Sequence, residues 1–118
     1  MQTPVVTSKT NPIKIAEWGA GCMAHSLLHT GGMTVKQETM PAGAKEVLHY
    51  HKHSQQYFYI LKGTAVFEID EVIYRLHPGD GIHVTPDQKH RIINKHSEEL
   101  ELLVCSQPSA DNDRFNIV

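Results

Sequence analysis

The sequence has few of the residues on which several protein classes depend. Only two of its 118 residues are cysteines, Cys22 and Cys105, and no C-x-x-C pair occurs, so neither a disulfide framework nor a cysteine zinc site is indicated. We expect two buried thiols. No window approaches the roughly 18 consecutive apolar residues of a membrane-spanning helix, and the N-terminus lacks the pattern of a signal peptide. A cytoplasmic location is therefore expected.

The charge is also too small and too scattered to indicate a polyanionic partner. There are 11 Lys and Arg against 13 Asp and Glu, with a net charge of −2, so neither a nucleic-acid surface nor an anionic-membrane surface is predicted. No G-x-S-x-G motif occurs, and Gly19-Ala-Gly21 lacks the glycine and helix of a nucleotide-binding loop. Covalent catalysis and nucleotide binding are not indicated, whereas a small ligand remains open.

The sequence does have the pattern of a β protein, in which short apolar runs are separated by turns. Short runs rich in β-branched and aromatic residues alternate with turn signals such as Gly31-Gly32 and Pro78-Gly79-Asp80, and no segment sustains helical periodicity. The fold class predicted is all-β, in one domain over residues 1–118 with an N-terminal arm at 1–12. Strands are expected at Ile13–Trp18, Met23–Leu28, Met33–Met40, Val47–His51, Gln56–Leu61, Thr64–Ile69, Val72–Leu76, Gly81–Val84, His90–Ile93 and Leu100–Cys105.

Two histidines in one predicted strand suggest a metal site. Side chains at i and i+2 of a strand point to the same face, so His49 and His51 converge, about 7 Å apart along the strand. Two imidazoles can hold one transition-metal ion if a neighbouring strand supplies a third ligand.

The segment around these histidines resembles the first conserved motif of the cupin superfamily. That motif reads Gly, five residues, His-x-His, three or four residues, Glu, six residues, Gly. Gly43, His49, His51 and Gly63 match in register. At the position of the Glu the chain has Gln56.

The second cupin motif is similar to residues 79–94. Gly79, His90 and Asn94 match, while Thr85 stands for the usual Pro and Asp87 for the usual Gly. The resemblance covers about Val35 to Val104, with motif 1 at 43–63 and motif 2 at 79–94. It implies a double-stranded β-helix, or jelly-roll, barrel with the metal inside. It also implies His49, His51, Gln56 and His90 as the ligand set.

Glutamine in place of glutamate changes the electrostatics of such a site. An amide oxygen is neutral, so the ion stays more electrophilic than beside a carboxylate. Imidazoles suit one divalent transition metal, with Fe(II), Ni(II) and Zn(II) ranked together. The alternative is that Gln56 only hydrogen bonds to a ligand or to a metal-bound water.

For several other side chains, both a functional role and a purely structural role are open. His83 is a tentative catalytic acid or base, or an ordinary strand residue; His53 is a rim ligand, or a loop residue. Tyr57 to Ile60 are expected to form a strand buried on both faces, in which Phe58 shares the parity of Gln56 and could line the cavity. The remaining histidines are expected at the surface: His25, His29, His77 and His96.

Two functions remain open at this stage. One is a metal-dependent enzyme of dioxygenase, isomerase or lyase type, in which the metal is a Lewis acid or an oxygen-activating centre. The other is a non-catalytic cupin that binds a small molecule or sugar. An acid or base inside the cavity would favour the enzyme, and the candidates are Glu38, Glu46, Glu68, Glu101 and His83. The resemblance further implies a homodimer, with Thr3–Trp18 available for strand exchange.

Overall fold

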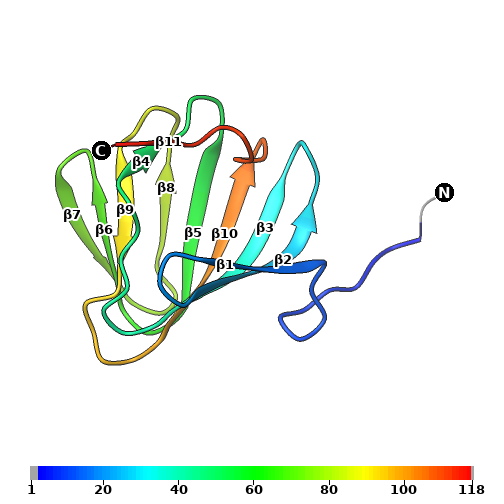
Figure 1. The fold of residues 1–118 in the computed structure, drawn as a ribbon, viewed down its shortest axis with the longest axis horizontal. Helices are drawn as coiled ribbons and strands as arrows, with labels where there is room; N and C mark the ends of the chain where they lie inside the picture. The colour runs from blue at the N-terminus through cyan, green and yellow to red at the C-terminus, as the bar shows by residue number, and fades with distance from the viewer. Residues whose placement is uncertain (1–2, 118) are drawn as a thin grey trace.

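The fold is an antiparallel sandwich of two sheets that close into a barrel (Figure 1). The computed structural model describes residues 3–117, so the first two residues of the predicted arm lie outside the described residues. The strands are β1 (Lys14–Trp18), β2 (Cys22–His29), β3 (Thr34–Met40), β4 (His49–Tyr50), β5 (Gln55–Lys62), β6 (Ala65–Ile69), β7 (Val72–Leu76), β8 (Gly81–Val84), β9 (His90–Ile93), β10 (Leu100–Gln107) and β11 (Phe115–Asn116).

Each sheet contains strands from both halves of the chain. One sheet has the order β1-β2-β3-β10-β5-β8 and the other β11-β4-β9-β6-β7. Residues 3–117 contain no helix, and the all-β, double-stranded β-helix prediction is confirmed. No helix long and apolar enough to cross a membrane exists among the described residues.

The core lies between the sheets and is built by alternation along each strand. In β5 the side chains of Gln56, Phe58 and Ile60 are buried, while those between them face outward. The expectation that this strand is buried on both faces is wrong, because Tyr57 and Tyr59 remain 45% and 37% exposed on the outer face of the six-stranded sheet. That sheet is covered by other strands on its inner face only, so alternate residues of β5 face away from the barrel.

Two turn residues of the cupin-like motifs have a backbone conformation that most residues avoid. Gly63 has φ +83°, and a Cβ there would lie 2.8 Å from the carbonyl oxygen of Glu99, so the turn after β5 requires glycine. Asp87, which replaces the second motif's Gly, also has a positive φ of 72°. Aspartate tolerates this region better than most residues, so the substitution preserves the turn that leads to His90.

Asn94 has a structural role at the other end of β9. Its side chain is fully buried, and its amide nitrogen donates to the carbonyl oxygens of Met40, Pro41 and Glu98. These bonds join the ends of β3 and β9 to the β9–β10 loop, which closes the barrel at the end away from the histidines.

The two ends of the chain behave differently. The described residues before β1 extend away from the sheets (Figure 1) and are held to β2 by Thr7, whose Oγ1 donates to the Leu27 carbonyl oxygen at 2.9 Å. β1 pairs with β2 of its own chain. After β10 the chain crosses the top of the barrel and ends in β11, which pairs with β4 (Figure 1). The sequence did not predict β11, because a two-residue strand leaves no periodic signal.

Candidate metal centre

Three histidines meet inside the barrel because their strands are neighbours. His49 in β4 is the register partner of His90 in β9, and His51 follows directly after β4. Their side-chain nitrogens lie within 4.8 Å of one another. The three residues are only 2%, 4% and 1% exposed for His49, His51 and His90. The structure therefore brings together the three histidines named from the sequence, in the arrangement of a cupin metal site.

All three rings are held in the same tautomer by backbone carbonyls. The Nδ1 atoms of His49 and His90 lie 2.8 Å from the carbonyl oxygens of Val47 and Gln88, and Nδ1 of His51 lies 2.7 Å from that of Asp113. A carbonyl oxygen only accepts, so each Nδ1 carries the proton and each Nε2 presents a lone pair. These are the nitrogens a metal ion requires.

Burial keeps His49 and His90 neutral. It lowers the pKa of His49 to about 3, with a further lowering by His90. It also lowers the pKa of His90 to about 4, against the opposing effect of the Gln88 hydrogen bond. Near neutral pH neither ring competes for a proton, so both are ready to ligate.

Gln56 extends the cluster toward β10. Its Nε2 donates to Oγ of Ser106 at 2.9 Å, which directs Oε1 at Nε2 of His90, 3.2 Å away. Because Nε2 of His90 has no proton, two acceptors face each other there. Nε2 of His51 is likewise buried without a hydrogen-bond partner among residues 3–117. Such an acceptor-rich buried site fits a cation.

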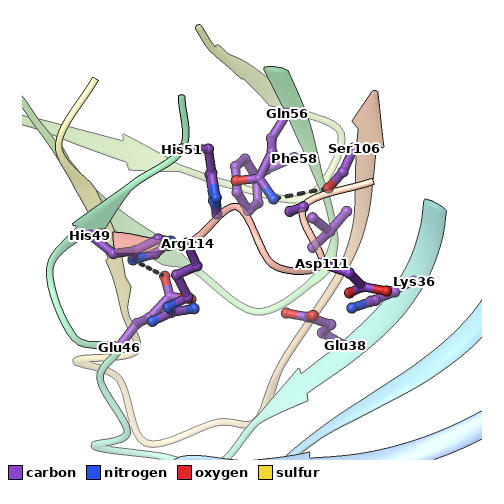
Figure 2. A pocket seen from close by; sticks show the side chains of 12 residues that line it. Lys36, Glu38, Glu46, His49, His51, Gln56, Phe58, Ser106, Asp111 and Arg114 are labelled. Atoms are coloured by element: carbon purple, nitrogen blue, oxygen red, sulfur yellow. Dashed lines mark hydrogen bonds and ion pairs between the residues drawn. The ribbon is translucent and has the colours of Figure 1, made fainter. Parts of the chain in front are cut away.

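His49 and His51 line a cavity of about 170 Å³, whereas His90 lies behind its wall. Figure 2 shows Glu38 on β3 across from His49 and His51, with Glu46 and Arg114 beside the imidazoles. Phe58 lines the cavity, as its parity with Gln56 had allowed. The lining residues are Lys36, Glu38, Glu46, His49, His51, Gln56, Phe58, Val104, Ser106, Ala110, Asp111 and Arg114.

Two carboxyl groups of this cavity hold protons unusually well. Burial, reinforced by the charge of Glu46, raises the pKa of Glu38 to about 8. Burial also raises the pKa of Glu46 to about 7, although Arg114 lowers it from an Nη1 to Oε2 distance of 3.3 Å. Groups that change protonation near neutral pH beside a cluster of potential metal ligands are suited to acid–base chemistry.

Several residues named from the sequence lie elsewhere. His83 pairs in register with Tyr57 on the outer sheet face, is exposed, and hydrogen bonds through Nε2 to Gln55 Oε1 at 2.8 Å. His53 is exposed beside His51. Glu68 pairs with Arg91, and Glu101 bonds to Gln37 and Lys9. The structure therefore does not bring these residues to the histidine cluster.

The sequence pattern gave no indication of the residues that the C-terminal segment brings to the site. Ala110, Asp111 and Arg114 line the cavity, and Asp113 supplies the carbonyl that orients His51. Lys36, which lies on a predicted strand, was missed as well, and so was Ser106, which lies one residue beyond the predicted strand Leu100–Cys105. In the structure Ser106 is the register partner of Gln56 across β10 and β5. Nothing in the sequence pattern places Ser106 or the C-terminal segment at the site.

A model of the cupin domain matches residues 36–106. The chain belongs to the cupin family. Among its curated relatives, an uncharacterized protein of Methanocaldococcus jannaschii is 28% identical over 83% of this chain and 82% of that protein. The tetracenomycin polyketide synthase protein TcmJ of Streptomyces glaucescens is 33% identical, over 56% of this chain but only 44% of TcmJ.

Solved cupin structures share this architecture. An RmlC-like cupin from Shewanella frigidimarina superposes with a TM-score of 0.80 at 22% identity, covering 95% of this chain and 98% of that one. A sugar phosphate isomerase from Silicibacter pomeroyi gives 0.68 at 22% identity, over 75% and 60%. At this level of identity the similarity establishes the fold, and function has to be argued from the site.

Proposed function

We propose that this cupin is a mononuclear transition-metal enzyme of isomerase or lyase type that moves a proton on a small carbonyl compound. His49, His51 and His90 would hold the ion, and Glu38 would carry the proton. The observation that supports catalysis is the Glu38 carboxyl, which lies in the histidine cavity with a pKa raised to about 8. A purely structural metal site has no need of such a group.

Gln56 is proposed as the fourth ligand. A cation placed between Gln56 Oε1 and His90 Nε2 would remove the repulsion of two acceptors 3.2 Å apart. Without the ion, the amide can rotate so that its NH₂ donates to His90 while Ser106 Oγ donates to the amide oxygen. Glutamine thus satisfies the buried site in both states, which a carboxylate at this position would not.

The donor set limits the metal and its chemistry. Three imidazoles and one amide suit Fe(II), Ni(II) or Zn(II) better than Mg²⁺ or Ca²⁺. When bound, the ion supplies Lewis-acid stabilisation of negative charge on a substrate oxygen.

Other cavity side chains are proposed to transfer the proton and to orient the substrate. Glu38, with a pKa near the working pH, can take a proton from a carbon next to a carbonyl and return it at the neighbouring position. Lys36 and Arg114 line the same cavity and can orient an anionic group of the substrate. Proton transfer is therefore favoured over oxygen activation, to which these groups contribute nothing specific.

The named neighbours are compatible with this reaction class. One superposed structure is a sugar phosphate isomerase, and isomerases of that class move protons between adjacent carbons of a carbonyl compound bearing an anionic group. Two curated relatives, TcmJ and the polyketide synthase CurC of Streptomyces cyaneus, are polyketide synthase proteins, whose chemistry also involves carbonyl compounds.

Solvent deuterium exchange tests the proposal. The Zn(II), Fe(II) and Ni(II) forms would be incubated in D₂O with keto-sugars, their phosphates and β-diketones, and carbon-bound deuterium measured by NMR. We expect metal-dependent exchange in the wild type and its loss in Glu38→Gln, with metal still bound. Glu99→Gln, an exposed glutamate, is the matched control. Oxygen uptake would instead indicate a dioxygenase, and ligand binding without turnover the binding module.

A homodimer and a cytoplasmic location remain predictions. For the dimer we propose the outer face of the six-stranded sheet, where Tyr57, Tyr59 and Leu61 are exposed side by side on β5. Contiguous apolar surface of this kind is typical of interfaces between copies. Light scattering of the wild type and of Tyr59→Glu would test it: a dimer that becomes a monomer supports this face.

A further inference from the structure

The polypeptide after β10 is tied to the histidine cluster by one aspartate. The carboxylate of Asp113 accepts the backbone N–H groups of Lys52, His53 and Ser54 at 3.0, 2.9 and 2.9 Å. The backbone carbonyl of the same residue accepts Nδ1–H of His51 at 2.7 Å. Asp113 therefore fixes both the loop after His51 and the imidazole itself.

Neighbouring residues anchor this segment along its length. Ser54 Oγ donates to the Pro108 carbonyl at 2.7 Å, and Ile117 N donates to the Leu48 carbonyl at 2.8 Å. The Phe115 ring stacks on Tyr50 with centroids 5.3 Å apart. Residues 109–117, hereafter the C-terminal strap, thus cover the end of the barrel where the histidines lie (Figure 1).

The three histidines differ in what orients them. His49 and His90 take their Nδ1 acceptors from Val47 and Gln88, each two residues earlier in the chain. His51 takes its acceptor from a residue 62 positions away. Two of the rings are therefore oriented locally, whereas the third depends on the strap.

We propose that Asp113 is a positioning residue that docks the C-terminal strap and thereby sets the ligating tautomer of His51, so that metal binding and strap docking are coupled. This rests on the proposed metal centre. Without the Asp113 carbonyl, His51 can carry its proton on Nε2, which then cannot bind a metal. Partners of this kind typically change metal affinity by about 10- to 100-fold. Coupling is reciprocal, so metal must also stabilise the docked strap.

The clamp is built to persist at neutral pH. Burial alone would raise the pKa of Asp113, but the hydrogen bonds from Ser54, His53 and Lys52 outweigh burial and hold the pKa below its ordinary value. Asp113 is 8% exposed, so its ionised carboxylate is largely shielded from water and bonded by three donors.

The strap also carries part of the cavity wall. Arg114 reaches Glu46 at 3.3 Å, and Ala110 and Asp111 line the cavity. Release of Asp113 would therefore disorganise one metal ligand and the surface that meets the substrate together, leaving His49 and His90 in place.

Ring ¹⁵N NMR of the metal-free protein tests the tautomer directly. In the wild type, His49, His51 and His90 should each show a protonated Nδ1 and an unprotonated Nε2. In Asp113→Ala only His51 should shift toward the other tautomer, with His49 and His90 as internal controls. The matched control is Asp80→Asn, because Asp80 accepts the backbone N–H of His77 at 2.9 Å and does not line the cavity; it should shift none of the three.

Zn²⁺ titration and hydrogen exchange complete the test. Asp113→Ala should bind Zn²⁺ about 10- to 100-fold more weakly than the wild type and Asp80→Asn, and Zn²⁺ should slow amide exchange in residues 110–117. If Asp113→Ala does not fold, Asp113→Asn and wild-type exchange give the same readouts. An unchanged His51 tautomer, or strap exchange indifferent to bound Zn²⁺, would overturn the proposal. If the wild type binds no metal, the proposed centre fails, while the tautomer measurement still reports on the strap.

Discussion

His49 and His90 are register partners across β4 and β9, and their imidazole centroids lie 4.3 Å apart inside the barrel. Backbone pairing thus places two ligand side chains before any metal arrives. His51 joins them from the end of the same strand as His49, at centroid distances of 5.0 and 5.4 Å. Preorganisation of this kind reduces the entropy that ion binding must overcome.

Gln56 provides the first prediction, because it can be replaced by residues of nearly equal size. Gln56→Glu should raise the affinity for Zn²⁺ by about tenfold or more, because it places a negative charge beside the ion. A tenfold increase requires only about 1.4 kcal/mol of additional binding free energy. Gln56→Leu should lower it. Isothermal titration calorimetry measures both, and Gln55→Leu, which changes the exposed neighbour, is the control. Equal affinities for Gln56→Leu and the wild type would rule out coordination by the amide.

The pH dependence of stability in the metal-free protein is the second prediction. His49 and His90 have folded pKa values of about 3 and 4, below the ordinary 6.5, so the unfolded chain gains protons first and stability falls as pH drops below 6.5. Glu38 and Glu46 have folded pKa values of about 8 and 7, above the ordinary 4.5. Their carboxyl groups therefore ionise first in the unfolded chain, and the free energy of unfolding falls as pH rises above 4.5.

These opposing contributions nearly cancel between pH 4.5 and 6.5. Urea unfolding should show maximal stability in that window and losses on both sides, toward pH 3 and toward pH 8. Glu38→Gln should flatten the alkaline loss, because an amide does not titrate. A stability that climbs steadily from pH 5 to pH 8 would contradict these pKa directions.

Gly63 gives a prediction about the fold alone. Gly63→Ala places a Cβ 2.8 Å from the Glu99 carbonyl oxygen at φ +83°, and should destabilise the protein by more than about 1 kcal/mol. Gly32→Ala is the matched control, because nothing lies within 4 Å of its added Cβ and its φ is not positive. Thermal unfolding would measure the difference, and equal midpoints for the two variants would be inconsistent with the close approach.

The all-β class and the pairing of His49 with His51 could be predicted because both depend on short-range patterns, whereas the jelly-roll barrel was implied by the resemblance to cupins. Alternation in β5, turn residues and the i, i+2 spacing of His49 and His51 are local, and the two motifs supplied His90. Which carboxylates face the cavity was not readable, since Glu38 and Glu101 both lie on predicted strands and only strand pairing decides their faces. Asp113 was invisible for a further reason: its contacts are 59 to 62 residues away and its segment has no periodicity.

The metal content of tag-free protein tests the central claim most directly. After chelation and titration with Zn²⁺, the wild type should bind one ion per chain, and His49→Ala, His51→Ala and His90→Ala should each lose that binding. His53→Ala and His83→Ala, which change exposed histidines, should bind as the wild type does. A wild type that takes up no ion, or cluster variants that bind as tightly as the wild type, would contradict a three-histidine metal centre.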